Sequence, residues 1–163
     1  MVAQVPTVSD FEVVAGDGSR VPLARKAGKV LLIVNTASRC GLTPQYNGLE
    51  ALWQRFNNRD FEILAFPCNQ FGHQEPESDA LIATFCDLHF GLSFPLMAKI
   101  EVNGPSTIPL YQWLKSEAPG LLGTPGIKWN FTKFLIGRDG RVVRRYAPAV
   151  TPSSLRRAIE ALL

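Results

Sequence analysis

Cys40 holds the position in this sequence that is best suited to chemistry. It follows the apolar run of residues 29–36, which predicts a strand buried on both faces, and it precedes Thr43-Pro44, a favourable helix start. Reactive groups in open α/β sheets lie at the carboxyl ends of strands, and the positive end of a helix dipole favours a thiolate. Cys40 is therefore a candidate nucleophile, and the alternative is a small buried hydrophobic side chain.

The segment Cys40-Gly41-Leu42-Thr43 has threonine where a redox Cys-x-x-Cys motif has its second cysteine. A thioredoxin or disulfide isomerase that uses a local cysteine pair is therefore not expected. The thiol must work alone or with a distant partner, and Cys68 and Cys86 are the other cysteines in the chain. An odd total of three is not typical of a disulfide scaffold, so a reducing cytoplasm is the expected compartment.

Strands and helices alternate along the chain, and this order predicts the scaffold that positions Cys40. Strands are expected at residues 11–14, 29–36, 61–66, 131–136 and 141–146, with a short one within 92–103; helices are expected at 44–56, 77–90, 106–117 and from 152 to the end. In helix 77–90, Leu81, Ile82 and Phe85 are expected to share a buried face. The pattern predicts an α/β protein of thioredoxin-like fold, with a central mixed β-sheet flanked by helices, an N-terminal β-hairpin turned at Asp17-Gly18, and one domain over residues 1–163.

Composition and charge exclude several classes of protein. The chain has 163 residues, 46% of them hydrophobic, which is enough for one core without metal or disulfide staples. Its net charge of +3 comes from scattered side chains, so no nucleic-acid partner is expected. The longest apolar run, residues 30–34, is too short to span a bilayer, and the start carries no secretory pattern. We therefore expect no stable membrane association and a cytoplasmic location.

Three segments resemble signature segments of the glutathione peroxidase family. They are Asn35-Thr36-Ala37-Ser38-Arg39-Cys40-Gly41-Leu42-Thr43 with Gln45-Tyr46, Phe66-Pro67-Cys68-Asn69-Gln70-Phe71-Gly72-His73-Gln74-Glu75-Pro76, and Lys128-Trp129-Asn130-Phe131-Thr132-Lys133-Phe134-Leu135. The resemblance runs in order over nearly the whole chain. It implies a thiol peroxidase that reduces hydrogen peroxide and organic or lipid hydroperoxides to water and alcohols, without a cofactor or metal.

The resemblance assigns four catalytic positions. Cys40 would be the peroxidatic cysteine, in place of selenocysteine. The rest of the family's tetrad would be Gln74, Trp129 and Asn130. Amide and indole N–H groups suit this role because they donate hydrogen bonds to moving charge without being titrated away. Without the resemblance, Trp129 would be interpreted as core, Asn130 as a turn residue and Gln74 as a solvated side chain. Gln70 and Asn69 are expected to hold the loop.

Cys86 lies in a segment, residues 85–95, that resembles the family's two-cysteine members. The resemblance implies that Cys86 resolves the Cys40 sulfenic acid as an intramolecular disulfide, which thioredoxin then reduces. Because a disulfide needs Cα atoms within about 7 Å, we expect local unwinding near Cys86 during turnover. The alternative for Cys86 is a cysteine of the helical core.

Other interpretations stay open at this stage. One is a one-cysteine, glutathione-dependent peroxidase, and another is a peroxide sensor or relay that passes its disulfide to a partner protein. A third is a zinc site built from Cys68, His73, Cys86 and His89, although the spacing is loose. Cys68 is otherwise expected to be structural, with a backup resolving role as its alternative. The connection of residues 103–128 is shorter than in the family's tetrameric members, so the resemblance implies a monomer or weak dimer with an open active site.

Overall fold

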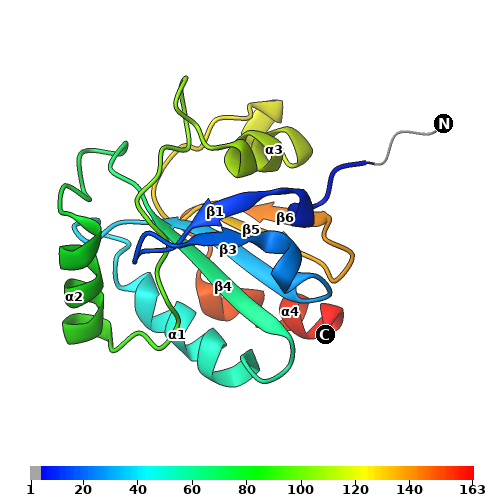
Figure 1. Ribbon diagram of the computed structural model, residues 1–163, viewed down its shortest axis with the longest axis horizontal. Coiled ribbons are helices and arrows are strands. Elements are labelled where there is room, and N and C mark those ends of the chain that lie inside the picture. Colours follow the sequence, from blue (N-terminus) through cyan, green and yellow to red (C-terminus); the bar gives the residue numbers. More distant parts are fainter. Residues whose placement is uncertain (1–4) are drawn as a thin grey trace.

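A four-stranded mixed sheet forms the centre of the computed structural model, which describes residues 5–163 (Figure 1). Its strands are β3 (Val30–Thr36), β4 (Phe61–Pro67), β5 (Lys133–Ile136) and β6 (Val142–Tyr146), in the order β4-β3-β5-β6. β3 runs parallel to β4 and antiparallel to β5, which is itself antiparallel to β6. A separate hairpin pairs β1 (Glu12–Val14) with β2 (Arg20–Pro22). The predicted mixed sheet and N-terminal hairpin are confirmed.

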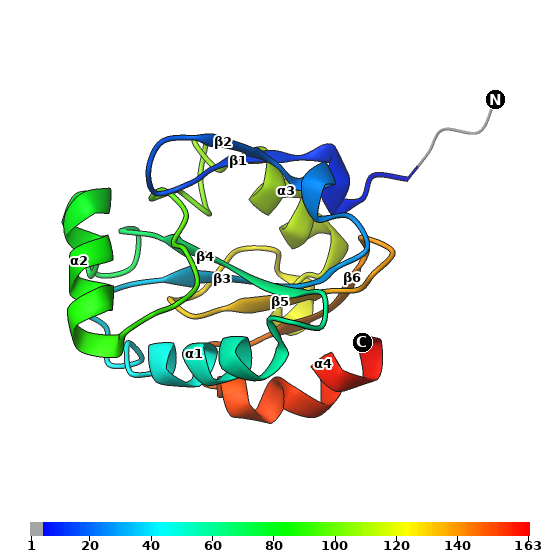
Figure 2. The same cartoon turned by 60° about the horizontal axis from the view of Figure 1, so that its bottom comes forward.

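Helices cover both faces of the sheet. They are α1 (Gln45–Phe56), α2 (Asp79–Phe90), α3 (Pro109–Glu117) and α4 (Arg156–Leu162), and α4 continues from a 3-10 turn at Pro152–Leu155. Figure 2 shows α1 and α4 below the sheet, α3 and the hairpin above it, and α2 at one end. No helix among residues 5–163 is both long and apolar enough to cross a membrane.

The central strand β3 is buried along its whole length because both of its faces carry a core. Leu32 and Val34 belong to the cluster that packs on α1, α2 and α4, which we call the lower core. Leu31 and Ile33 belong to the cluster that packs on α3 and the hairpin, the upper core. Since successive side chains of a strand point to opposite faces, a continuous apolar run is required here.

The segment of residues 92–103 does not form the predicted strand. It makes only isolated bridges, from Met97 to Ala15 and from Leu96 to Ala65. The segment passes between the hairpin and the edge of β4 and pairs with each at one residue, so no ladder develops. Elsewhere the predicted elements occur with shifted ends: α3 begins at Pro109, and β5 begins at Lys133 because Phe131 adopts a left-handed conformation (φ 64°).

Helix α2 begins two residues later than expected, after Ser78, whose hydroxyl accepts a hydrogen bond from the Leu81 amide (3.3 Å). The expected face was partly wrong. Leu81 is 56% exposed, whereas Ile82 and Cys86 are buried. The reason is the position of α2 beyond the end of the sheet, where only a narrow stripe of the helix meets the lower core.

Lys133 is a fully buried cation at the start of β5. Its Nζ donates to the carbonyl oxygens of Pro148 (2.8 Å) and Val150, and so fastens the segment after β6 to the sheet. Burial lowers the pKa of this amine to about 7. The folded chain therefore releases this proton far more easily than the unfolded chain does.

We expect this difference to make stability depend on pH. Between about pH 7 and pH 8.5 the unfolded state holds more protons on Lys133 than the folded state. The free energy of unfolding should therefore rise with pH, by up to about 1.4 kcal/mol per pH unit from this group. Urea unfolding across that range should show the rise in the wild type and in the exposed-lysine control Lys128→Met, but not in Lys133→Met. If the free energy of unfolding changed with pH in the same way in all three proteins, Lys133 would not be the source of the dependence.

Candidate active site

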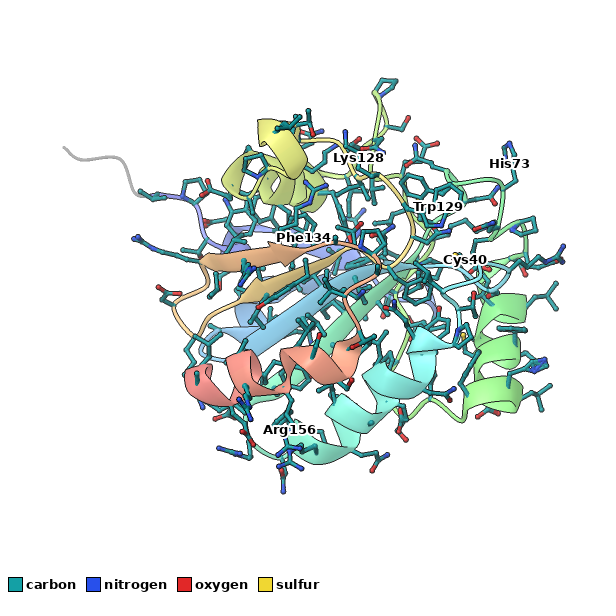
Figure 3. All side chains as sticks on the ribbon, turned by 180° about the vertical axis from the view of Figure 1, so that it is seen from behind. Cys40, His73, Lys128, Trp129, Phe134 and Arg156 are labelled. Carbon is teal, nitrogen blue, oxygen red and sulfur yellow. The ribbon has the colours of Figure 1, made fainter. Side chains whose placement is uncertain are left out.

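Cys40 lies in the turn between β3 and α1, at the carboxyl end of the central strand (Figure 3). Its side chain is 8% exposed. Two N–H groups donate to the sulfur: the Leu42 backbone amide (3.3 Å) and the Trp129 indole Nε1 (3.3 Å). Both donors point at the atom that a nucleophilic role would use. The predicted position of Cys40 at the end of a buried strand is confirmed.

Thr43 does not cap helix α1, contrary to the sequence-based expectation. The residue at the N-cap position is Pro44, and the helix begins at Gln45. The Thr43 hydroxyl instead accepts a hydrogen bond from the Cys40 amide (2.9 Å) and donates to the Ala37 carbonyl (2.8 Å). The Thr43 hydroxyl, which we expected to accept a hydrogen bond from a free N–H group at the start of the helix, therefore fixes the backbone of the cysteine turn.

Gln74 and Asn130 form a second pair beside the cysteine. The Asn130 side-chain amide donates to the Gln74 side-chain oxygen (3.0 Å), and the Gln74 backbone carbonyl accepts from the Arg39 amide (3.0 Å). Asn130 is buried, whereas Trp129 is 36% exposed. Because Gln74 accepts through its oxygen, its amide NH₂ is left to donate. The structure thus brings Cys40, Gln74, Trp129 and Asn130 together from three separate loops.

Gly72 lies against both the Trp129 ring and the Gln74 side chain. Its φ of 63° is left-handed, and a Cβ there would lie 3.4 Å from the indole and 3.5 Å from Gln74. The Phe71 ring also packs on Trp129, with 5.7 Å between ring centroids. A larger residue at position 72 would be strained by this left-handed backbone, and its Cβ would lie in van der Waals contact with both side chains.

Asn35 anchors the loop that carries Trp129, and sequence reasoning gave it no role. Its side-chain amide donates to the Trp129 carbonyl (3.3 Å), and its own carbonyl accepts from the Phe131 amide (2.7 Å). Phe131 is the buried residue with left-handed backbone. The signal available in the sequence was an asparagine near the end of an apolar strand. The structure shows Asn35 fully buried, and a buried polar side chain needs a hydrogen-bond partner.

Asn103 is a second residue that sequence reasoning missed. Its side chain donates to the Ile127 carbonyl (2.8 Å) and accepts from the Ile127 amide (2.9 Å), just before Trp129. Gln70 in turn accepts from the Asn103 amide (3.1 Å) and donates to its carbonyl (2.8 Å). Asn69 accepts from the Glu75 amide (3.0 Å). The expectation that Gln70 and Asn69 hold the loop is confirmed.

Cys86 is buried in the lower core, to which Cys40 also belongs. Burial raises the pKa of its thiol to about 11, against a lowering by Tyr46 and with a further rise from Glu75. Both cysteines are free thiols in this structure. A resolving role for Cys86 thus remains a prediction, and α2 is an intact helix around it.

Cys68 lies in the upper core, on the opposite face of the sheet from Cys86. Burial raises its pKa, and its thiol donates weakly to the Gln70 side chain (3.7 Å). The zinc site considered from the sequence needs Cys68 and Cys86 in one place, and the sheet separates them. Within residues 5–163, no group of three or more His, Cys, Asp or Glu side chains is placed to hold a metal ion.

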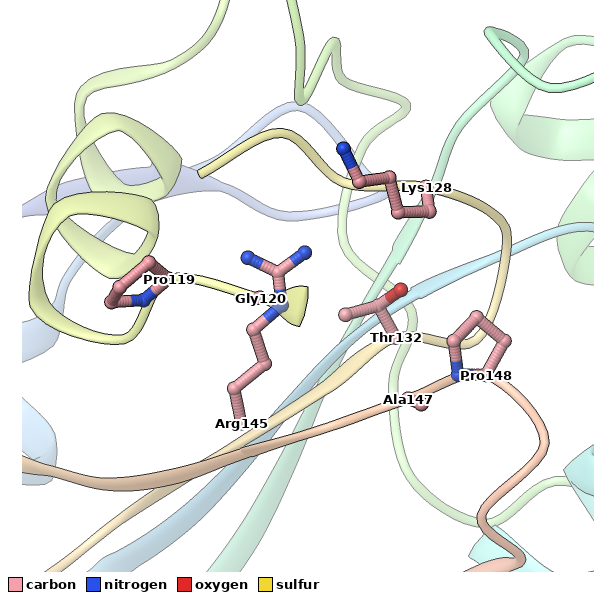
Figure 4. Close-up of a pocket in the computed structure, with 7 residues that line it drawn as sticks. All are labelled: Pro119, Gly120, Lys128, Thr132, Arg145, Ala147 and Pro148. Carbon is pink, nitrogen blue, oxygen red and sulfur yellow. The ribbon is translucent and has the colours of Figure 1, made fainter. Parts of the chain in front are cut away.

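A cavity of about 460 Å³ opens beside the Trp129 loop (Figure 4). Lys128, Thr132 and Arg145 contribute side chains to its wall. The Thr132 hydroxyl donates to the Trp129 carbonyl (3.0 Å), and the Arg145 guanidinium donates to the carbonyls of Pro125 (2.9 Å) and Gly126 (2.7 Å). Two side chains in the wall of this cavity therefore also hold the loop of residues 125–129.

The family model for glutathione peroxidase matches residues 8–115. The glutathione peroxidase-like peroxiredoxin HYR1 of Saccharomyces cerevisiae is 55% identical over 146 residues, which cover 90% of each chain. The hydroperoxy fatty acid reductase gpx1 of Synechocystis is 51% identical over 162 residues, which cover 96% of each chain.

Solved structures agree with these sequence matches. The crystal structure of Trgpx in its apo form has a TM-score of 0.82 and 44% identity, and covers 98% of this chain and 96% of its own. A thiol:disulfide interchange protein of the thioredoxin family from Chlorobium tepidum has a TM-score of 0.71 at 16% identity and covers 99% of each chain, which confirms the thioredoxin-like fold. The chain therefore belongs to the glutathione peroxidase family, and it is a peroxidase of the non-selenium type with cysteine at position 40.

Proposed function

We propose that this peroxidase reduces hydroperoxides through a sulfenic acid formed at Cys40, with Gln74, Trp129 and Asn130 as its catalytic partners. The observation that carries the proposal is the pair of N–H donors on the Cys40 sulfur, from Leu42 and Trp129. The two donors hold the Cys40 sulfur, a nucleophile of the required type, in place beyond the carboxyl end of the central strand.

The first step is an in-line attack of the Cys40 thiolate on one peroxide oxygen. The O–O bond breaks, Cys40 gains that oxygen as a sulfenic acid, and the other oxygen leaves as hydroxide or alkoxide and takes a proton. Negative charge thereby moves from sulfur to oxygen. The Trp129 indole and the Gln74 amide supply N–H donors for that charge, and Asn130 holds Gln74 in place.

In the second step Cys86 condenses with the Cys40 sulfenic acid to give a disulfide and water. An external dithiol of the thioredoxin type then reduces the disulfide by exchange. The peroxiredoxin-type relative from yeast supports this reductant. Because α2 is capped at Ser78 and Gly91 and Cys86 is buried within it, we infer that the helix unwinds locally before the bond forms.

The proposal also covers the substrates, the oligomeric state and the cellular compartment. The named Synechocystis relative and the partly exposed Trp129 support organic and lipid hydroperoxides as substrates besides hydrogen peroxide. Residues 1–163 would act as one domain, because both apolar cores share the strands of the four-stranded sheet. The protein would be a monomer or weak dimer and would act in the cytoplasm, where free thiols persist.

Peptide mapping after one equivalent of hydrogen peroxide tests the cycle. We expect the wild type to lose two hydrogens and to show a Cys40–Cys86 crosslink, whereas Cys86→Ser should retain an added oxygen at Cys40. The control Cys68→Ser should behave as the wild type, since the sheet separates Cys68 from Cys86. An oxidised wild type with free Cys86 would instead indicate a one-cysteine, glutathione-dependent enzyme. A crosslink that thioredoxin cannot reduce would indicate a relay.

Trp129→Phe removes the indole donor and keeps an aromatic ring. We expect the rate of Cys40 oxidation to fall on the order of 10²-fold, because one donor to the developing charge is lost. Stopped-flow peroxide consumption in single turnover measures this rate. Trp53→Phe, a half-buried tryptophan on α1, is the matched control and should leave it unchanged. Equal rates for both variants would contradict a catalytic role for Trp129.

Amide hydrogen exchange tests the unwinding of α2. In the reduced protein, amides within Asp79–Phe90 should be protected by the intact, doubly capped helix. In the disulfide form the amides around Cys86 should exchange much faster, while those of the buried strand β3 stay protected. Unchanged protection around Cys86 would show that the disulfide forms without unwinding.

A further inference from the structure

Asn103 lies in the connection between α2 and α3, and its side chain holds the chain just before Trp129. The Asn103 Nδ2 donates to the Ile127 carbonyl (2.8 Å), and the Asn103 Oδ1 accepts from the Ile127 amide (2.9 Å). A carboxamide that pairs with both backbone groups of one residue fixes the position and the orientation of that residue. Ile127 is two residues before Trp129, whose indole donates to the Cys40 sulfur.

Asn103 is itself held from two other elements. The Gln70 side chain accepts from the amides of Val102 (2.7 Å) and Asn103 (3.1 Å), and it donates to the Asn103 carbonyl (2.8 Å). From α3, the Lys115 Nζ donates to the Val102 carbonyl (2.6 Å) and to the Asn103 Oδ1 (3.3 Å). Because the backbone and the side chain of Asn103 are both held, its carboxamide offers Ile127 a fixed pair of partners.

These hydrogen bonds connect the two loops that carry the proposed donors to the moving charge. Gln70 belongs to the loop that contains Gln74, and Ile127 belongs to the loop that contains Trp129. Asn103 is bonded to both loops, to Gln70 through its backbone and to Ile127 through its side chain. The spacing of the two loops is therefore supported by a link that does not pass through a strand.

The Trp129 loop is held on both sides of the indole. On the far side, the Trp129 carbonyl accepts from the Asn35 side chain (3.3 Å). On the near side, Asn103 holds Ile127, and Arg145 holds the two residues before Ile127. Since the indole itself is partly exposed, packing alone does not fix it. The bonds to the backbone on either side then decide where the indole N–H lies.

We propose that Asn103 is a positioning residue for the Trp129 indole and so sets the rate at which peroxide oxidises Cys40, which rests on the catalytic role proposed above for Trp129. Within residues 5–163, Asn103 makes no hydrogen bond to Cys40 or to the indole, so it acts through the backbone of Ile127. A misplacement of about 1 Å can cost on the order of 10²-fold in rate. Loss of the Asn103 side chain frees Ile127, and the indole Nε1 then leaves its place 3.3 Å from the sulfur.

A double-mutant cycle on the full chain tests this role. Stopped-flow single turnover with hydrogen peroxide gives the rate of Cys40 oxidation in the wild type, in Asn103→Ala, in Trp129→Phe and in the double variant. We expect Asn103→Ala to slow oxidation about tenfold in the wild type but less than about twofold in Trp129→Phe, because the indole that Asn103 positions is then absent.

Asn57→Ala is the matched control for this cycle. The Asn57 side chain also donates to a backbone carbonyl near a tryptophan, that of Trp53 (2.7 Å), but it lies at the end of α1. The Asn57→Ala variant should therefore oxidise at the wild-type rate.

The indole N–H signals in NMR spectra of the reduced protein give a second readout. Trp129→Phe identifies the Trp129 signal by its loss. Asn103→Ala should shift that signal, whereas Asn57→Ala should leave it in place. If Asn103→Ala does not fold, Asn103→Asp replaces it in both measurements, because it keeps the acceptor for the Ile127 amide and loses the donor to the Ile127 carbonyl.

Equal slowing in both backgrounds would show that Asn103 supports the fold in general, and this would overturn the proposal. An unmoved Trp129 signal would also overturn it. A wild-type rate in Asn103→Ala beside a slow Trp129→Phe would remove the role of Asn103 and leave that of Trp129 intact. A wild-type rate in Trp129→Phe would instead contradict the catalytic role of Trp129, and with it this role for Asn103.

Discussion

The hydrogen bond from the Trp129 indole to the Cys40 sulfur is the contact on which the rest of the site depends. Its two residues are 89 positions apart in the chain, so only the sheet can bring them together. Antiparallel pairing of β3 with β5, with Val34 opposite Lys133, places the end of β3 beside the loop that precedes β5. The two apolar cores hold that register, because a shift of one residue would exchange the faces of β5.

Building the site costs stability, and the fold tolerates this only because its cores are large. The buried atoms without partners in residues 5–163 include Asn35 Oδ1, Glu75 Oε1 and Asn130 Oδ1, all at the carboxyl end of β3 or in the segments that surround it. Each costs roughly 1–3 kcal/mol. The left-handed backbone of Phe131 adds strain at the same place. Unpaired groups and strain gathered around one cysteine are typical of a functional site.

Local pattern predicted most of the fold but not the contacts that make the site precise. The run before Cys40 could only be a strand with two covered faces, and Cys40 was identifiable from its place at the end of that strand. Thr43 was misassigned because its hydroxyl serves the cysteine turn rather than the helix. Leu81 was misassigned because the covering of α2 depends on tertiary position. Asn103 was missed because its two hydrogen bonds with Ile127 join residues 24 positions apart. The periodicity of apolar residues in a sequence does not indicate such long-range contacts.

The two thiols of the proposed cycle occupy environments that impose an order on their chemistry. Cys40 has donors on its sulfur and lies at the surface of the lower core, so it can meet peroxide while the fold is intact. Cys86 is sealed in a capped helix, and burial keeps its proton in place. The Ser78 N-cap contributes only on the order of 1 kcal/mol to this helix. An early reaction of Cys86 is thus disfavoured by access and by protonation, and in the proposed cycle both obstacles are removed when α2 unwinds locally.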